Sequence, residues 1–189
     1  MEILKMTFQK MCWAMRGIAY KATFGKFGNV SYIGKPVSIV GAKKIFIGDK
    51  VRIYSGIRME AANGGSIRIH DNCSIAQNVH ITADGEELSI GSGTTILGNS
   101  FITNLDHEYK EIGVPILKQK RTVKATQIGE NCFIGMGACI QAGTVLGKQC
   151  VVGANAVVRG TYPDYCVIVG VPARVIKKYN PETGKWEKV

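Results

Sequence analysis

The chain has 189 residues, of which 46% are hydrophobic and 23 are glycine, and this composition is typical of one turn-rich β domain with a real core. The net charge of +10 raises the question of nucleic-acid binding, but the basic residues are scattered and accompany no recognition motif for DNA or RNA. We therefore expect no nucleic-acid partner. Attraction to a phosphate-bearing cofactor, an anionic glycan or a membrane surface accounts for the charge equally well.

Residues 1–30 form the first segment that the sequence sets apart. Their apolar residues are interrupted by Lys5, Lys10 and Arg16, and the longest apolar run, Met11–Met15, is too short for a signal sequence or a membrane span. The pattern predicts an amphipathic helical segment. This segment either closes the exposed end of the fold that follows or makes peripheral contact with a membrane, and the sequence leaves both open.

Residues 31–170 carry a six-residue repeat, which is clearest near the end of the chain. Aliphatic residues open the units there, at Ile128, Ile134, Ile140, Leu146, Val152 and Val158. A small or modest side chain stands four positions after each of the first five, at Cys132, Ala138, Thr144, Cys150 and Ala156. A period of six matches neither a helix (about 3.6) nor a half-buried strand (about 2). It predicts a β-solenoid with three short strands per turn of a triangular prism, the aliphatic and small residues pointing inward. We expect the glycine that often follows the aliphatic residue to ease a tight corner.

The six cysteines include no CxxC pair, so we expect no zinc site. Cys73, Cys132 and Cys150 fall at the small inward position of the repeat, where a thiol acts as a compact apolar group. Such thiols indicate a reducing compartment. We therefore expect the protein in the cytoplasm, with peripheral contact to the inner face of the membrane left open.

The repeat breaks between Glu108 and Gln127. These 20 residues form an excursion loop, and a loop of this length in a compact domain is usually functional or disordered. It leaves the prism directly after His107, which favours function. A histidine there can act as a general base near neutral pH, although a solvated loop histidine is the plain alternative. His70 and His80 fall on the prism itself, where we expect surface positions, with a groove-lining position left open for His80.

The span from Ile69 to Lys178 resembles the galactoside, maltose and related sugar O-acetyltransferases of the hexapeptide-repeat acyltransferase family. The likeness is closest to the capsular-polysaccharide and O-antigen O-acetyltransferases, through the stretches SIAQNVHIT, FITNLDHEY and YNPETGKWEK. The resemblance implies an all-β, left-handed parallel β-helix that transfers an acetyl group directly from acetyl-CoA to a sugar hydroxyl in surface-polysaccharide biosynthesis. It further implies His107 as the general base, a homotrimer with active sites between subunits, and no metal.

The same resemblance suggests the other site residues. The sugar acetyltransferases hold the acceptor with an asparagine where this chain has Ala76, and we expect Asn78, Asn104 and Asp106 to serve instead. Asp106, Glu108 and a backbone carbonyl are the candidates to orient the imidazole, and the sequence leaves the choice open. Coenzyme A is expected along small residues and near basic ones: Gly135, Met136, Gly153, Ala154, Arg159, Arg174 and Lys177. Residues 171–189 are expected to form a C-terminal tail.

Three other hypotheses are available for this scaffold. An N-acetyltransferase acting on a nucleotide-linked aminosugar shares the fold, and the sequence does not name the acceptor atom. A non-catalytic β-helix that serves assembly would leave the histidine at the loop mouth unexplained. A γ-type carbonic anhydrase needs three histidines on zinc, and the separations of 10 and 27 residues here include no closely spaced pair.

Overall fold

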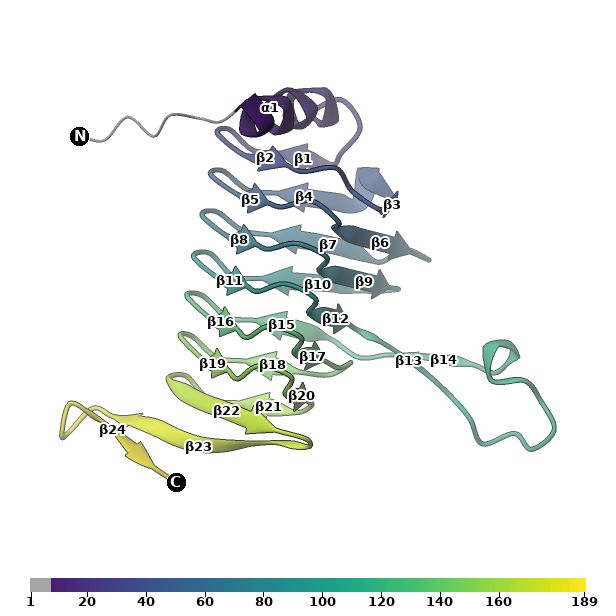
Figure 1. Cartoon of the computed structure of the whole chain (residues 1–189). Coiled ribbons are helices and arrows are strands. Elements are labelled where there is room, and N and C mark those ends of the chain that lie inside the picture. Colours follow the sequence, from purple (N-terminus) through teal and green to yellow (C-terminus); the bar gives the residue numbers. More distant parts are fainter. Residues whose placement is uncertain (1–7) are drawn as a thin grey trace.

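The computed structural model describes residues 8–189, which form a stack of short strands wound into a prism (Figure 1). Three mainly parallel sheets make the faces of the prism. The seven-stranded sheet has the order β1 (Lys26–Phe27), β4 (Ile45–Ile47), β7 (Ser66–Ile69), β10 (Glu87–Ile90), β15 (Thr126–Ile128), β18 (Val145–Leu146) and β21 (Thr161–Tyr162). The nine-stranded sheet has the order β2 (Tyr32–Ile33), β5 (Arg52–Ile53), β8 (Ser74–Ile75), β11 (Thr95–Ile96), β16 (Phe133–Ile134), β19 (Val151–Val152), β22 (Cys166–Gly170), β23 (Ala173–Asn180) and β24 (Lys185–Lys188). The six-stranded sheet has the order β20 (Val157–Val158), β17 (Cys139–Ile140), β12 (Phe101–Thr103), β9 (His80–Asp84), β6 (Arg58–Ala62) and β3 (Ser38–Val40).

The strand register follows the hexads. Ile128 pairs with Leu146 and Ile134 with Val152, each partner 18 residues further along the chain, so three hexads complete one turn. The predicted parallel β-helix is confirmed. In the part of the chain from residue 8 onward, one α-helix, α1 (Phe8–Tyr20), precedes it, and two short 3-10 helices, η1 (Ala42–Lys44) and η2 (Ile116–Lys118), interrupt the strands.

The core of the prism consists of the residues that open the hexads. The predicted positions Ile134, Ile140 and Leu146 are at most 2% exposed, and Cys73, Cys132 and Cys150 are equally buried. Burial raises the pKa of the Cys73 thiol to about 11, so this group stays neutral and packs as an apolar side chain. Ile39 is the exception, because β3 is an edge strand and Ile39 is only half-buried.

The glycines that follow the aliphatic residues have a different role from the one expected. Gly135 and Gly153 do not adopt a positive φ. A Cβ on Gly135 would instead lie 2.5 Å from the backbone nitrogen of Ala154 in the next coil. These glycines are therefore required by the close approach of stacked coils, rather than by an unusual backbone angle at a corner.

The two ends of the stack are covered differently. Helix α1 lies across the first coil, where Trp13 packs on Tyr32 and Tyr54 with ring centroids 5.9 and 5.6 Å apart. Residues 1–7 of the predicted N-terminal segment lie outside the described residues. At the other end, β23 and β24 extend the nine-stranded sheet as antiparallel strands, so the tail covers the last coil. Within residues 8–189, no helix is long and apolar enough to cross a lipid bilayer.

The predicted excursion loop is an ordered arm that projects sideways from the prism (Figure 1). Strands β13 (Leu105–His107) and β14 (Arg121–Val123) pair antiparallel, with His107 opposite Arg121. We call residues 105–123 the arm. Near its tip, the buried Gln119 side chain donates to the carbonyl oxygens of Glu111 and Val114 and accepts from the Glu111 N–H. The arm therefore has its own internal hydrogen bonds.

Candidate active site

The root of the arm is fixed by a buried polar cluster. Asn104, which is 0% exposed, accepts a hydrogen bond from the Asp84 N–H at 2.8 Å and donates to the carbonyl oxygens of Asp84 and Glu86. The Asp84 carboxylate, 7% exposed, accepts from Arg121 of β14 at 2.8 Å. Burying a carboxylate without a partner costs folding free energy, whereas an ion pair and hydrogen bonds offset that cost. The cluster therefore holds both strands of the arm against the prism.

His107 lies at the end of β13 with an exposed side chain. Within residues 8–189, its ring makes no hydrogen bond and no ion pair. The two carboxylates expected to orient it are engaged elsewhere. Asp106 pairs with Arg159, and Glu108 accepts a hydrogen bond from the Thr122 hydroxyl at 2.9 Å.

The Glu108 carboxylate keeps its charge in this setting. The hydrogen bond from Thr122, and after it the charge of Lys110 with Nζ at 3.6 Å, lower the pKa of Glu108 below its ordinary value. Glu108 is therefore an anion at neutral pH and does not serve as a proton donor.

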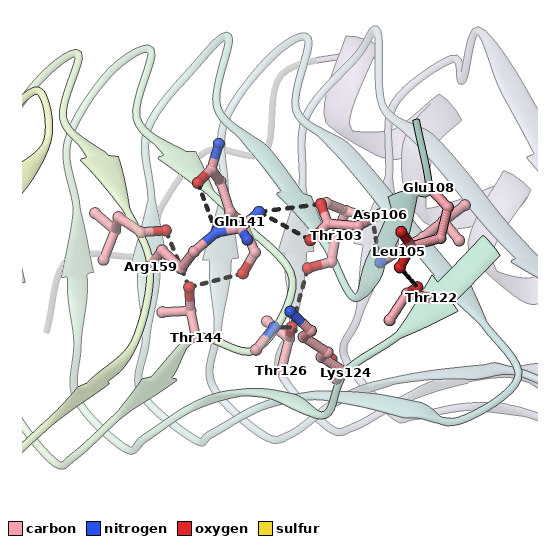
Figure 2. A network of polar contacts seen from close by, with 12 residues as sticks. Thr103, Leu105, Asp106, Glu108, Thr122, Lys124, Thr126, Gln141, Thr144 and Arg159 are labelled. Carbon is pink, nitrogen blue, oxygen red and sulfur yellow. Dashed lines mark hydrogen bonds and ion pairs between the residues drawn. The ribbon is translucent and has the colours of Figure 1, made fainter. Parts of the chain in front are cut away.

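An ion pair fastens the arm to the coils on its C-terminal side (Figure 2). Arg159 Nη2 donates to both carboxylate oxygens of Asp106, at 2.9 and 3.1 Å, and Arg159 Nε donates to Gln141 Oε1 at 3.0 Å. Asp106 and Arg159 are 53 residues apart, yet they meet because Gln141 and Arg159 occupy the same place in successive coils. We call Asp106, Gln141 and Arg159 the clamp.

A pocket of about 330 Å³ opens where the arm leaves the prism. It is lined by Asp106, His107, Glu108, Tyr109, Lys110, Thr122, Lys124 and Arg159. The pocket combines an exposed imidazole with three cationic side chains, and it lies open to solvent. The geometry suits a polar, anionic or hydroxyl-rich ligand whose reacting atom meets His107.

Four of the expected cofactor residues form a stack at the corner between the nine-stranded and six-stranded sheets. Gly135 and Met136 follow β16, and Gly153 and Ala154 occupy the same corner one coil further on, where the Asn155 N–H donates to the Met136 carbonyl at 2.8 Å. The Met136 and Ala154 side chains are exposed. The stack therefore presents a narrow surface of small groups and backbone.

Two of the expected cations lie close to that corner and one does not. A Cβ on Gly153 would meet the Val169 side chain of β22, and Val169 pairs in register with Arg174 of β23. Lys177, also on β23, lies opposite Val167 of β22. Arg174 and Lys177 are both exposed. Arg159 instead lies at the far end of β20, where Asp106 engages it. One chain therefore carries the expected cofactor residues at two separate corners of the prism.

The expected acceptor residues are dispersed. Asn78 is an exposed residue with φ of 58° in the turn between β8 and β9, whereas the arm leaves the prism beyond β12. The role of Asn104 needs correction, because this side chain is fully buried and its amide is used by the backbone of residues 84 and 86. Only Asp106 of the three lines the pocket.

Sequence reasoning missed Gln141, Asp84 and Lys124, which respectively complete the clamp, anchor the arm and line the pocket. Counting in turns of 18 residues would have placed Gln141 and Arg159 side by side. No local pattern pointed to Asp84, whose partner Arg121 is 37 residues away.

Comparisons with known proteins place this architecture in a class. Residues 125–160 match the family described as bacterial transferase hexapeptide (six repeats). WbbJ of Escherichia coli (strain K12), a protein provisionally named as a lipopolysaccharide biosynthesis O-acetyl transferase, is 37% identical over 169 residues, which cover 86% of each chain. The chain therefore belongs to the hexapeptide-repeat acyltransferase family, and it is an acetyltransferase of that family.

Two further comparisons show how widely the likeness extends. The galactoside O-acetyltransferase of Escherichia coli (strain K12) is 26% identical over 160 residues, which cover 85% of this chain and 66% of that protein. A point mutant of the N-acyltransferase AntD from Bacillus cereus, solved in complex with dTDP and coenzyme A, superposes with a TM-score of 0.76 at 20% identity. That superposition covers 88% of this chain and 90% of AntD, and at this identity it shows a shared fold.

Proposed function

We propose that this protein is an acetyl-CoA-dependent O-acetyltransferase that acts on a sugar hydroxyl in surface-polysaccharide biosynthesis. The observation that carries the proposal is His107, an exposed imidazole at the mouth of a polar pocket. Its ring is free of hydrogen bonds within residues 8–189 and can accept a proton from an incoming hydroxyl. The 37% identity to the lipopolysaccharide protein WbbJ supports a saccharide acceptor.

The mechanism is a direct transfer. The neutral His107 ring removes the proton of the acceptor hydroxyl while the hydroxyl oxygen attacks the thioester carbonyl. The carbon–sulfur bond then breaks, and coenzyme A leaves as a thiolate that takes up the proton. Backbone N–H groups beside the donor stabilise the oxyanion. Asp106 contributes by fixing the arm through Arg159, and Asp106 and Asn78 remain candidates for acceptor contacts.

Donor binding is assigned to the corner stack Gly135, Met136, Gly153 and Ala154, with Arg174 and Lys177 at the phosphates. Small side chains let a thin pantetheine arm lie against the backbone, and exposed cations near the end of the stack attract anionic groups. Arg159 serves primarily in the clamp. Since AntD, which shares the fold, binds coenzyme A, a donor of this type is consistent with the scaffold.

Assembly into a homotrimer would complete the site. The pocket beside His107 is open, and the imidazole has no orienting partner within residues 8–189. The arm tip also exposes large apolar side chains, with Ile112 at 96% and Leu117 at 83% exposure. Exposed apolar side chains of this size on a projecting arm favour contact with a second subunit. A neighbouring chain would bury them and supply the second wall of the pocket.

The test follows thiol release from acetyl-CoA with a panel of sugars, oligosaccharides and nucleotide-linked aminosugars. The His107→Ala variant is compared with the wild type and with the matched control His70→Ala, which removes an exposed imidazole of the prism outside this pocket. General-base catalysis predicts a loss of turnover of about 10²–10⁴-fold for His107→Ala. Turnover of His107→Ala near that of the wild type would remove the mechanism. Acetylation of an amine rather than a hydroxyl would instead establish the aminosugar hypothesis. Sedimentation as a fully active monomer would refute the shared site.

A further inference from the structure

We infer that the α1 end of the prism docks on the surface of an anionic lipid bilayer. Helix α1 is separated by several coils from β13, the strand that ends at His107 (Figure 1). The proposal therefore stands whether or not the proposed catalytic function is correct. It commits to one occupant, a membrane with acidic headgroups, and three independent features of the described residues support it.

The first feature is that α1 is apolar on two opposite faces. Its inner face packs Trp13, 8% exposed, against the first coil, and a Cβ on Gly17 would touch the Phe27 ring. Its outer face presents Met11, Met15 and Ile18, which are 45, 61 and 67% exposed. Residues spaced by four and three positions share one face of a helix, so these three side chains form a continuous stripe pointing away from the prism.

The second feature is an apolar hollow beside the stripe. A cavity of about 340 Å³ opens between α1 and the first coil, and its lining includes Ile18, Val30, Phe27 and Lys21. Val30, in the turn between β1 and β2, is 81% exposed and continues the apolar surface beyond the helix. Apolar walls with a lysine at the rim suit the boundary between acyl chains and acidic headgroups.

The third feature is the distribution of charge, which is less even than the scattered appearance of the sequence suggests. Residues 8–58 contain ten Lys and Arg against a single acidic residue, Asp49, and so carry nine of the ten net positive charges of the chain. These residues form α1 and the first two coils. Of the ten cations, only Arg58 forms an ion pair within residues 8–189. Adjacent coils lie about 4.8 Å apart, so the cations of the first two coils are gathered at the α1 end of the stack.

The charge also decides between possible occupants. Two copies of the chain meeting through their α1 ends would bring two strongly positive surfaces together, and the repulsion opposes such a dimer. A nucleic acid would satisfy the charge but would leave the Met11–Met15–Ile18 stripe without an apolar partner. A bilayer with acidic headgroups meets both requirements, because it offers negative charge at its surface and hydrocarbon beneath it.

The experiment is flotation of the full-length protein with vesicles of phosphatidylcholine, with and without phosphatidylglycerol. We expect binding to the anionic vesicles that weakens as salt is raised. The variant Met11→Gln/Met15→Gln/Ile18→Gln keeps good helix formers on α1 and should bind at least roughly tenfold more weakly. The matched control Val171→Gln/Ile176→Gln changes apolar side chains that are 70 and 40% exposed at the opposite end of the prism, and it should bind as the wild type does.

A second pair of variants tests the position of the charge. Lys43→Gln/Lys44→Gln, on η1 of the second coil, should lower binding by up to roughly fivefold per lysine. Lys185→Gln/Lys188→Gln removes the same charge at the opposite end of the prism and should have little effect. Equal losses from both pairs, or equal binding to neutral vesicles, would overturn the proposal. Tight binding of a short DNA duplex that the stripe variant leaves unchanged would also overturn the proposal. Self-association of the wild type that the stripe variant abolishes would do the same. Circular dichroism confirms that α1 is retained in each variant.

Discussion

The clamp offers the sharpest prediction about the arm. Replacing Arg159 by Met removes the guanidinium that bridges Asp106 and Gln141 while keeping an unbranched side chain of similar length. The Arg159 and Asp106 side chains are 48 and 29% exposed, so water screens the pair. Half-exposed pairs of this kind contribute roughly 0.5–1 kcal/mol. This is too little to unfold the prism, but it is enough to raise the open population of the arm about two- to fivefold.

Hydrogen exchange measures that population. The arm amides whose partners lie across the β13–β14 ladder, such as Glu108 N–H on the Lys120 carbonyl, should exchange about two- to fivefold faster in Arg159→Met. Amides of the core strands should be unchanged. Asp106→Asn should give the same effect, and the double variant should add nothing to it, because the two residues act as one unit.

The matched control is Lys148→Met, which breaks the exposed pair with Glu130 on another part of the prism. It should leave exchange in the arm unchanged. Additive effects of Arg159→Met and Asp106→Asn would refute the clamp, as would equal acceleration by Lys148→Met. If the clamp also positions His107, turnover should fall with a largely unchanged Michaelis constant for acetyl-CoA.

Three further predictions concern other parts of the molecule. Gly135→Ala should destabilise the fold by about 1–3 kcal/mol even without coenzyme A, since its Cβ would lie 2.5 Å from the Ala154 backbone nitrogen; an unchanged denaturation midpoint would show that the coils can separate. His80 should make stability fall as the pH drops through about 6.5, because burial first, and then the Arg58 charge, lower its folded-state pKa and the unfolded chain binds the proton more readily. His80→Gln should lose part of that dependence in thermal melts, and an unaltered pH profile would contradict the assignment. Arg174→Ala should weaken coenzyme A binding, more so at low salt, with little effect on turnover at saturating donor; calorimetry at two salt concentrations checks this, and salt-independent affinity would argue against a phosphate contact.

The sequence determined the prism and the place where it is interrupted. The hexad repeat determines which residues face the interior of the prism, because a shift by one residue would turn Ile134, Ile140 and Leu146 outward. Burial of such aliphatic side chains is the dominant favourable contribution to the folding free energy. The excursion between Glu108 and Gln127 was equally visible, since the pattern stops there. The position of His107 followed from that break. These features are local or strictly periodic, which is why they can be found without coordinates.

Only the tertiary structure decided which polar groups meet. Asp106 and Arg159 are 53 residues apart in the sequence, separated by the arm and two coils. Because the arm interrupts the 18-residue period, counting turns along the sequence does not predict that they meet. Asn104 looked like an acceptor ligand but lies inside, because the root of the arm needs a buried amide to satisfy the backbone of residues 84 and 86. The terminal strands β23 and β24 were likewise invisible to a hexad pattern, since they pair antiparallel along a sheet edge that only the finished stack provides.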